Sequence, residues 1–319
     1  MELYVPKNKK LYIIANTPNI QESPSEFRNS LGNYEVDGVY LVYNNGRSGD
    51  SGFITSRGDV EFRRFEVFFN ALLDLEIEKG IVIEALGSKF SPYSTYTCID
   101  GSKVVGWIHP ALVDRYLTFD QRYKRTIDLL EGFVDSNVSI LFDHIRYPNP
   151  KSGFRSVSSY NQDTCKRMWA ANISEVSKVT SILADYLRDL GVRSFSGVLH
   201  TPIEYNDNAC AKAWNVGQAY DDTVGLTKYI DRVFMLMYYA QREDYLKWMR
   251  DLARTGTTLN GFSTRGTSRP LYFLMSVEAP HYWTSNLQEV IDEALQWFEG
   301  LVIWDYTSLH RKVTRIDRY

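Results

Sequence analysis

Carboxylates at the ends of short apolar runs are the residues in this 319-residue sequence with the clearest potential for chemistry. Glu84, Asp143, Glu278 and Asp305 each lie at or near the end of such a run. If two of these carboxyl groups converge, one can act as an acid and the other as a nucleophile or base. Any single one could instead cap a helix or form a structural salt bridge. Their repeated position nevertheless predicts a shared rim of carboxylates.

Aromatic side chains accompany these acids. Aromatic residues make up 14% of the chain, and Tyr43, Tyr238, Tyr239 and Trp304 stand at the ends of apolar runs. A flat aromatic face can stack on a sugar ring while its hydroxyl or indole N–H remains a polar tip. Carboxylate pairs cleave glycosidic bonds, so the combination predicts carbohydrate chemistry.

Short strands are expected to position these residues. Apolar runs rich in β-branched and aromatic residues alternate with longer segments of helical period. Because the runs are nearly continuous rather than alternating, both faces of each strand should be buried, which is typical of a parallel sheet covered by helices. The predicted strands are residues 10–16, 38–43, 80–86, 139–145, 194–200, 232–239, 271–278 and 301–306.

Helix signals occupy the gaps between the runs. Ser23, Pro24 and Glu26 form a capping box with proline at the first helical position, and Ser285 with Gln288 forms a second capping box, whose helix should run to Gly300. Apolar residues at helical spacing predict two further helices, over residues 62–72 and 176–190, with Gly80 and Gly191 as the respective stops.

Eight strands alternating with helices favour a (β/α)8 TIM barrel, with residues 1–319 as a single domain. A doubly wound open sheet is the alternative, but the first strand is followed by Asn16-Thr17-Pro18 rather than by a G-x-G-x-x-G loop. Few residues remain after the eighth strand, so the last helix should be short or absent. In such barrels the active site lies at the C-terminal ends of the strands, where the acids stand.

One string carries a family resemblance. Residues 140–148, Ile-Leu-Phe-Asp-His-Ile-Arg-Tyr-Pro, resemble the F-D-Y-I-R-F-P signature on the fourth strand of a group of TIM-barrel glycoside hydrolases distantly similar to α-amylase-like barrels. Residues 235–239 and 300–305 resemble that group's sixth-strand P-M-x-Y and eighth-strand G-x-x-x-W-[DN] endings. The sequence departs from the pattern at His144, where a Tyr is usual, and at His200, where an Asp is expected.

The resemblance implies that Asp143 is a catalytic carboxylate. An ion pair with Arg146 would favour its ionised form, although the same pair could be purely structural. A second carboxyl group is needed, and we rank Glu278 first, then Glu204, then Glu84. Glu278 is preferred because side chains of the fourth and seventh strands can converge over the barrel axis.

Further residues at the strand ends are expected to bind the substrate. The resemblance places Trp304 on the floor of the cleft, with a cis peptide bond to Asp305. The full set of predicted substrate-binding residues is Arg146, His144, His200, Tyr238, Tyr239, Trp304, Asp305 and Tyr43.

Metal ligation is a further possibility that the histidines raise. The five histidines all fall after or near strand ends, and His200, His144 and Asp305 could together hold a metal. However, the first strand has no H-x-H and no helix carries H-E-x-x-H. The sequence therefore predicts no metal and no other cofactor.

Composition excludes other classes of function. The formal net charge is −3 and no basic stripe is present, which argues against nucleic-acid binding. No apolar run approaches the roughly 18 residues of a membrane span, and no signal-peptide pattern occurs, so a cytoplasmic location is the default expectation. We therefore expect a glycoside hydrolase acting on an oligo- or polysaccharide. A non-catalytic carbohydrate-binding barrel and a metal-dependent hydrolase are the alternatives.

Overall fold

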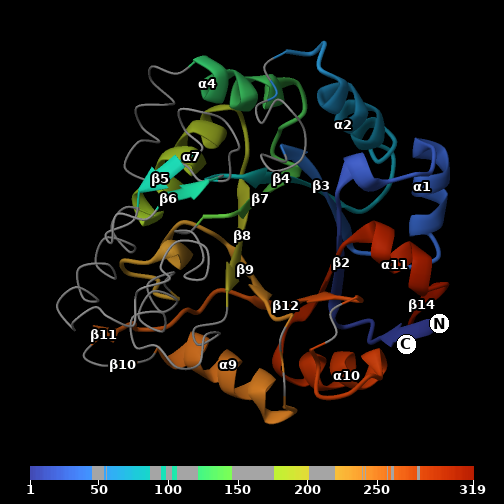
Figure 1. Cartoon of the computed structure of the whole chain (residues 1–319), viewed down its shortest axis with the longest axis vertical. Helices are drawn as coiled ribbons and strands as arrows, with labels where there is room; N and C mark the ends of the chain where they lie inside the picture. The colour runs from blue at the N-terminus through green and yellow to red at the C-terminus, as the bar shows by residue number, and fades with distance from the viewer. Residues whose placement is uncertain are drawn as a thin grey trace.

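Eight parallel strands close into the barrel that the sequence predicts (Figure 1). The computed structural model describes residues 1–44, 54, 56–86, 95–97, 103–105, 121–145, 176–200, 220–238, 240, 242–256, 258–259, 262–278 and 281–319. In chain order the barrel strands are β2 (Lys10–Ala15), β3 (Gly38–Asn44), β4 (Glu78–Glu84), β7 (Val138–Asp143), β8 (Ser194–His200), β9 (Arg232–Leu236), β12 (Leu271–Ser276) and β13 (Gly300–Trp304). Around the barrel they follow the order β12-β13-β2-β3-β4-β7-β8-β9, so the (β/α)8 prediction is confirmed.

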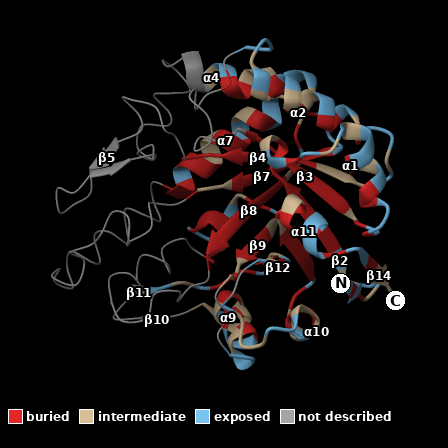
Figure 2. Cartoon of the chain, turned by 45° about the vertical axis from the view of Figure 1, so that its right-hand side comes forward, coloured by how far each residue is buried: buried red, intermediate tan, exposed pale blue. Residues whose placement is uncertain are grey.

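Helices cover the outside of this barrel. Figure 2 shows their buried sides turned toward the strands and their exposed sides turned outward. The last helix, α11 (Tyr306–Lys312), is short, as predicted. No helix in the described ranges is long and apolar enough to cross a membrane. The other helices are α1 (Pro24–Leu31), α2 (Val60–Asn70), α4 (Gln121–Asp128), α7 (Ser177–Asp189), α9 (Asp244–Thr255) and α10 (Leu287–Trp297), with 3-10 turns η1 (Thr17–Asn19), η3 (Leu129–Gly132) and η6 (Leu226–Lys228).

The two ends of the described chain pair with each other outside the barrel. β1 (Glu2–Val5) and β14 (Arg315–Arg318) run parallel, with Glu2 opposite Arg315 and Val5 opposite Arg318. The pair is not predicted from the sequence, because each strand has only four residues. Antiparallel pairs are formed by β5 (Thr95–Thr97) with β6 (Lys103–Val105) and by β10 (Thr258–Leu259) with β11 (Phe262–Ser263).

The helix ends confirm one predicted cap and correct another. At α1 the Ser23 Oγ accepts a hydrogen bond from the Glu26 N–H, and the Ser23 N–H donates to the Glu26 carboxylate at 2.9 Å. The box predicted at Ser285 is wrong. Instead, Asn286 caps α10, and its side-chain oxygen accepts a hydrogen bond from the Gln288 N–H at 3.1 Å. Asparagine supplies an equally good acceptor one residue later.

Gly80 lies inside a strand and does not end a helix as predicted. Helix α2 ends at Asn70, and β4 already begins at Glu78. A Cβ atom on residue 80 would lie only 2.1 Å from the ring of Tyr40 on the neighbouring strand. Glycine is therefore required at this position so that the Tyr40 ring can fill the barrel interior.

The end of the barrel where the strands begin is closed by a partly buried ion pair. Arg232 donates hydrogen bonds to both Glu78 carboxylate oxygens, at 2.9 and 2.5 Å, and to the hydroxyls of Tyr12 and Tyr40. Burial raises the pKa of Glu78, but hydrogen bonds and charge from Arg232, together with the Tyr40 hydroxyl, outweigh it and lower this pKa to about 2. The pair thus stabilises the folded state through the ionised form of Glu78.

This shift predicts acid sensitivity. Because the folded-state pKa of Glu78 lies below the ordinary 4.5, its contribution is complete above pH 4.5 and declines as the pH falls toward 2. The loss should reach about 3 kcal/mol in the free energy of unfolding. Urea unfolding measured between pH 6 and pH 2.5 tests this. In E78Q the pH dependence should be shallower, and an unchanged slope would contradict the assignment.

Candidate active site

Alternation along the strands brings the candidate site residues into the barrel mouth. The interior apolar cluster includes Val82, Leu141 and Val302, and side chains two positions apart on a strand share a face. Glu84, Asp143 and Trp304 lie two residues beyond these positions. They therefore continue the inward-facing rows past the last apolar layer, at the C-terminal ends of β4, β7 and β13.

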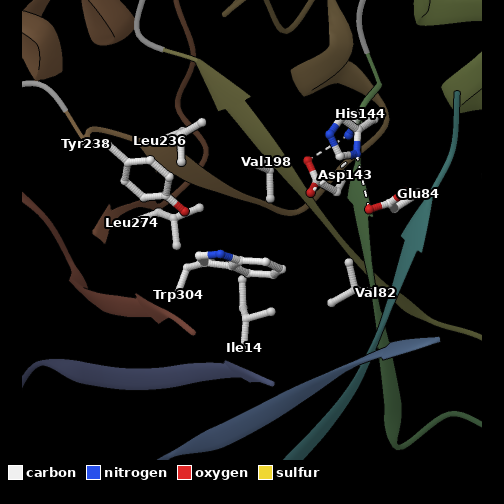
Figure 3. A pocket seen from close by; sticks show the side chains of 10 residues that line it. All are labelled: Ile14, Val82, Glu84, Asp143, His144, Val198, Leu236, Tyr238, Leu274 and Trp304. Atoms are coloured by element: carbon white, nitrogen blue, oxygen red, sulfur yellow. Dashed lines mark hydrogen bonds and ion pairs between the residues drawn. The ribbon is translucent and has the colours of Figure 1, made fainter. Parts of the chain in front are cut away.

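These residues line a pocket of about 340 Å³ (Figure 3). Its floor and one side are apolar, whereas Glu84, Asp143 and His144 form a polar wall. Such a volume lies in the range of small-molecule sites. Besides these three residues the lining comprises Ile14, Val82, Val198, Leu236, Tyr238, Leu274 and Trp304.

Two carboxylates meet at the polar wall. Glu84 and Asp143 are direct neighbours in the register between β4 and β7. Glu84 is only 7% exposed. The His144 Nδ1 lies 3.7 Å from a Glu84 oxygen and 3.6 Å from an Asp143 oxygen. One carboxylate oxygen of Glu84, one of Asp143 and one ring nitrogen of His144 all lie within 4.8 Å of one another. Strand β4 therefore brings a second carboxyl group, that of Glu84, next to Asp143 on β7.

Among the described residues, these three side chains also have the spacing of metal ligands. Two carboxylates and an imidazole could hold a divalent cation. The trio considered from the sequence, His200, His144 and Asp305, does not form such a group.

Trp304 lines the pocket, and the predicted cis bond between Trp304 and Asp305 is present. Asp305 has another position. It is buried and caps α11, where its carboxylate accepts a hydrogen bond from the Ser308 N–H at 3.1 Å. Asp305 is absent from the pocket lining, so the structure assigns it to holding the helix that follows Trp304.

The prediction that the Glu278 carboxylate lies beside Asp143 is wrong. Strand β12 ends at Ser276, so Glu278 lies in the following turn. Its side chain is exposed and forms an ion pair with Arg311 of α11 at 3.0 Å. The chain leaves the barrel wall two residues earlier than the apolar run predicts, and Glu278 therefore faces the helix layer.

Tyr43 also needs correction as a substrate-binding residue. Its ring packs against Phe62 and Phe65 of α2, and its hydroxyl donates a hydrogen bond to the Thr126 carbonyl at 2.7 Å. Tyr43 is one residue out of phase with the inward-facing Tyr40 and Val42 row. It therefore belongs to the layer between the barrel and its helices.

Of the remaining predicted site residues, the structure describes Tyr238 and His200. Tyr238 lines the pocket, and His200 is buried at the end of β8, where its carbonyl accepts a hydrogen bond from the Tyr220 hydroxyl at 2.7 Å. His200 is not part of the pocket lining. Arg146, Glu204 and Tyr239 lie outside the described residues.

The apolar part of the pocket is not predicted from the sequence. Ile14, Val82, Val198, Leu236 and Leu274 come from five different strands, at their last inward-facing apolar position. The signal that could have found them is their spacing, two residues before a polar or aromatic strand end. A single apolar residue within a strand otherwise indicates only core.

Solved structures share this fold. The catalytic domain of β-amylase from Paenibacillus polymyxa aligns with a TM-score of 0.58 and 10% identity, over 96% of this chain and 94% of that chain. An endo-1,4-β-D-mannanase from Thermotoga petrophila gives 0.51 and 9%, over 93% and 88%. A maltogenic α-amylase from Thermotoga neapolitana gives 0.53 and 9%, over 99% and 70%. No protein-family model and no curated protein sequence matches this chain. At this identity the similarities show the TIM-barrel fold.

Proposed function

We propose that this protein hydrolyses a glycosidic bond, with Glu84 and Asp143 as the paired carboxylates. The observation that carries the proposal is their juxtaposition on the wall of the pocket, with oxygens within 4.8 Å. The pocket lies at the end of the barrel where such folds carry their active sites. The fold shared with an amylase and a mannanase is consistent with this reading.

The spacing favours hydrolysis with retention of configuration. Retaining enzymes hold their two carboxyl groups about 5–5.5 Å apart, whereas inverting enzymes need about 6.5–9.5 Å to admit a water molecule between carboxylate and sugar. One oxygen of Glu84 lies within 4.8 Å of one oxygen of Asp143. We take this short separation as support for the retaining reaction.

Each carboxyl group has a role that its surroundings support. The Asp143 Oδ1 accepts a hydrogen bond from the His144 N–H at 2.7 Å, which favours an ionised carboxylate. Asp143 is assigned as the nucleophile that attacks the anomeric carbon. Glu84 is more buried, and burial favours a neutral carboxyl group, so it donates its proton to the departing glycosidic oxygen. In the second step Glu84 takes a proton from water, which displaces Asp143 from the sugar.

The aromatic and aliphatic lining supports an oligo- or polysaccharide as substrate. Trp304 and Tyr238 bring flat faces to the pocket opposite the carboxylates (Figure 3). A pyranose ring can stack on such a face while its anomeric carbon approaches the acidic wall. A pocket with this division orients the sugar as well as binding it.

A carbohydrate-binding barrel without catalysis is the second candidate. It would use the same aromatic lining but would not require a second carboxylate beside Asp143. Because Glu84 lies next to Asp143, the geometry favours the enzyme.

The test is a panel of α- and β-linked oligo- and polysaccharides incubated with the purified protein, followed by reducing-sugar analysis. We expect one class of substrate to be cleaved, and NMR of the released sugar should show that its anomeric configuration is retained. E84Q should lower turnover about 100-fold or more, with less loss on substrates whose leaving group needs no protonation. E278Q, an exposed carboxylate paired with Arg311, is the matched control and should retain wild-type activity.

Treatment with a chelator distinguishes the proposed reaction from that of a metal-dependent hydrolase. Activity should survive prolonged treatment with EDTA, because the proposed reaction uses only carboxylates. Loss of activity that returns on addition of a divalent cation would instead favour a metal-dependent hydrolase. Binding of saccharides without cleavage of any would favour the binding barrel.

A further inference from the structure

His144 lies between the two carboxylates rather than beside a single one. Its Nδ1 is nearly equidistant from a Glu84 oxygen, at 3.7 Å, and an Asp143 oxygen, at 3.6 Å. The side chain is 11% exposed, so water screens these contacts weakly. Figure 3 shows the imidazole at the edge of the pocket, with its contacts directed to both acids. One side chain thus contacts both proposed reacting groups.

The backbone of His144 makes this contact possible. Its φ angle is 53°, in the left-handed region, which non-glycine residues adopt uncommonly. In an extended strand the side chain after Asp143 would point to the opposite face, toward the helices. The left-handed turn returns the imidazole to the face of Asp143. The same turn places the His144 N–H on the Asp143 Oδ1, at 2.7 Å.

The proposed reaction needs Glu84, which carries the proton, and Asp143, which is ionised, to keep a fixed separation. Either side chain could turn away from the other by rotation about its own bonds. A polar group between them limits how far the two side chains can separate. An imidazole at 3.6–3.7 Å from both oxygens has this position.

We infer that His144 is a positioning residue that holds Glu84 and Asp143 at their reacting separation. The inference rests on the proposed function for its catalytic consequence. It differs from the role expected from the sequence, in which His144 binds substrate. A substrate-binding residue would act mainly on KM, whereas a positioning residue acts on kcat.

The first experiment compares His144→Gly with His144→Asn on the substrate that the panel identifies. Glycine and asparagine both tolerate the left-handed backbone, so the variants differ chiefly in the side chain. The asparagine amide can place a polar group near both carboxyl groups, as the imidazole does, whereas glycine offers none. H144G should lower kcat about 100-fold with KM within about threefold, and H144N should retain most of kcat.

Free imidazole supplies an additional readout. It should restore part of the activity of H144G and none of the activity of a variant that lacks the Asp143 carboxylate. A full kcat in H144G, an equal loss in H144N and H144G, or a change confined to KM would overturn the inference.

A second experiment needs no activity, and so separates failure of this inference from failure of the proposed function. The stability cost of H144G is measured by urea unfolding at pH 5.5, where an ordinary imidazole is mostly protonated, in the Glu84 protein and in E84Q. If His144 holds Glu84, the cost should be smaller in the E84Q background. Equal costs in the two backgrounds would overturn the inference, whether or not the protein cleaves a saccharide.

Discussion

Replacement of Asp143 by Asn should lower turnover by at least about 1000-fold while leaving the protein folded. The amide keeps the shape of the side chain, and its oxygen can still accept the hydrogen bond that the His144 N–H gives to the Asp143 Oδ1. It cannot form the glycosyl ester that a retaining reaction requires. Steady-state kinetics on the identified substrate, with urea unfolding alongside, measure both parts of the expectation.

Azide provides a control for the role of Asp143. In a nucleophile variant, a small external anion can attack the sugar and restore turnover, giving a glycosyl azide of inverted configuration. D143N with wild-type kinetics would contradict the mechanism. An unfolded D143N would show that Asp143 is primarily structural.

Replacement of Arg232 by Met should produce the largest loss of stability, about 3–5 kcal/mol in the free energy of unfolding. Arg232 and Glu78 are 13% and 25% exposed. Loss of the guanidinium therefore leaves a partly buried carboxylate without its counter-charge. Urea unfolding of wild type and R232M at pH 7 measures the effect.

Two comparisons make this expectation specific. Arg28→Met removes an exposed pair with Asp74 and should cost less than about 1 kcal/mol. The double variant E78Q/R232M should be more stable than R232M alone, because no uncompensated charge remains. If R28M and R232M cost the same, the Arg232 pair does not have the structural importance assigned here.

The architecture could be predicted from the sequence because it follows from local patterns. Each of the eight barrel strands overlaps a predicted apolar run, since burial on both faces leaves a continuous signal. The capping box at Ser23 was equally readable. Strand ends were harder, because the apolar run at residues 271–278 continues past the last ladder partner, Ser276.

The second carboxylate beside Asp143 could not be identified from the sequence, because the exact strand ends could not be predicted. Glu84 and Glu278 both follow apolar residues, and only the point where each strand ends decides which one faces the mouth. Glu84 lies in register with Asp143 within the sheet, whereas Glu278 lies two residues beyond β12. Tyr43 shows the corresponding error of phase, since a shift of one residue reverses the face of a strand.

The turn at His144 was also beyond prediction. Nothing in the residues 143–145 marks a left-handed backbone at a histidine, and no glycine stands there as a signal. The sequence indicated only that His144 departs from the fourth-strand pattern expected at this position. The position of the imidazole relative to both carboxylates depends on the three-dimensional path of the chain.

The pairing of β1 with β14 has a mechanical consequence. Because these strands are parallel, tension applied at residues 1 and 319 pulls them along their lengths in opposite directions. The hydrogen bonds of the ladder are then loaded together in shear, rather than one after another as in an antiparallel pair pulled from the same end. Force transmitted through residues 1 and 319 is therefore carried in shear by this small ladder before it reaches the barrel that carries the pocket.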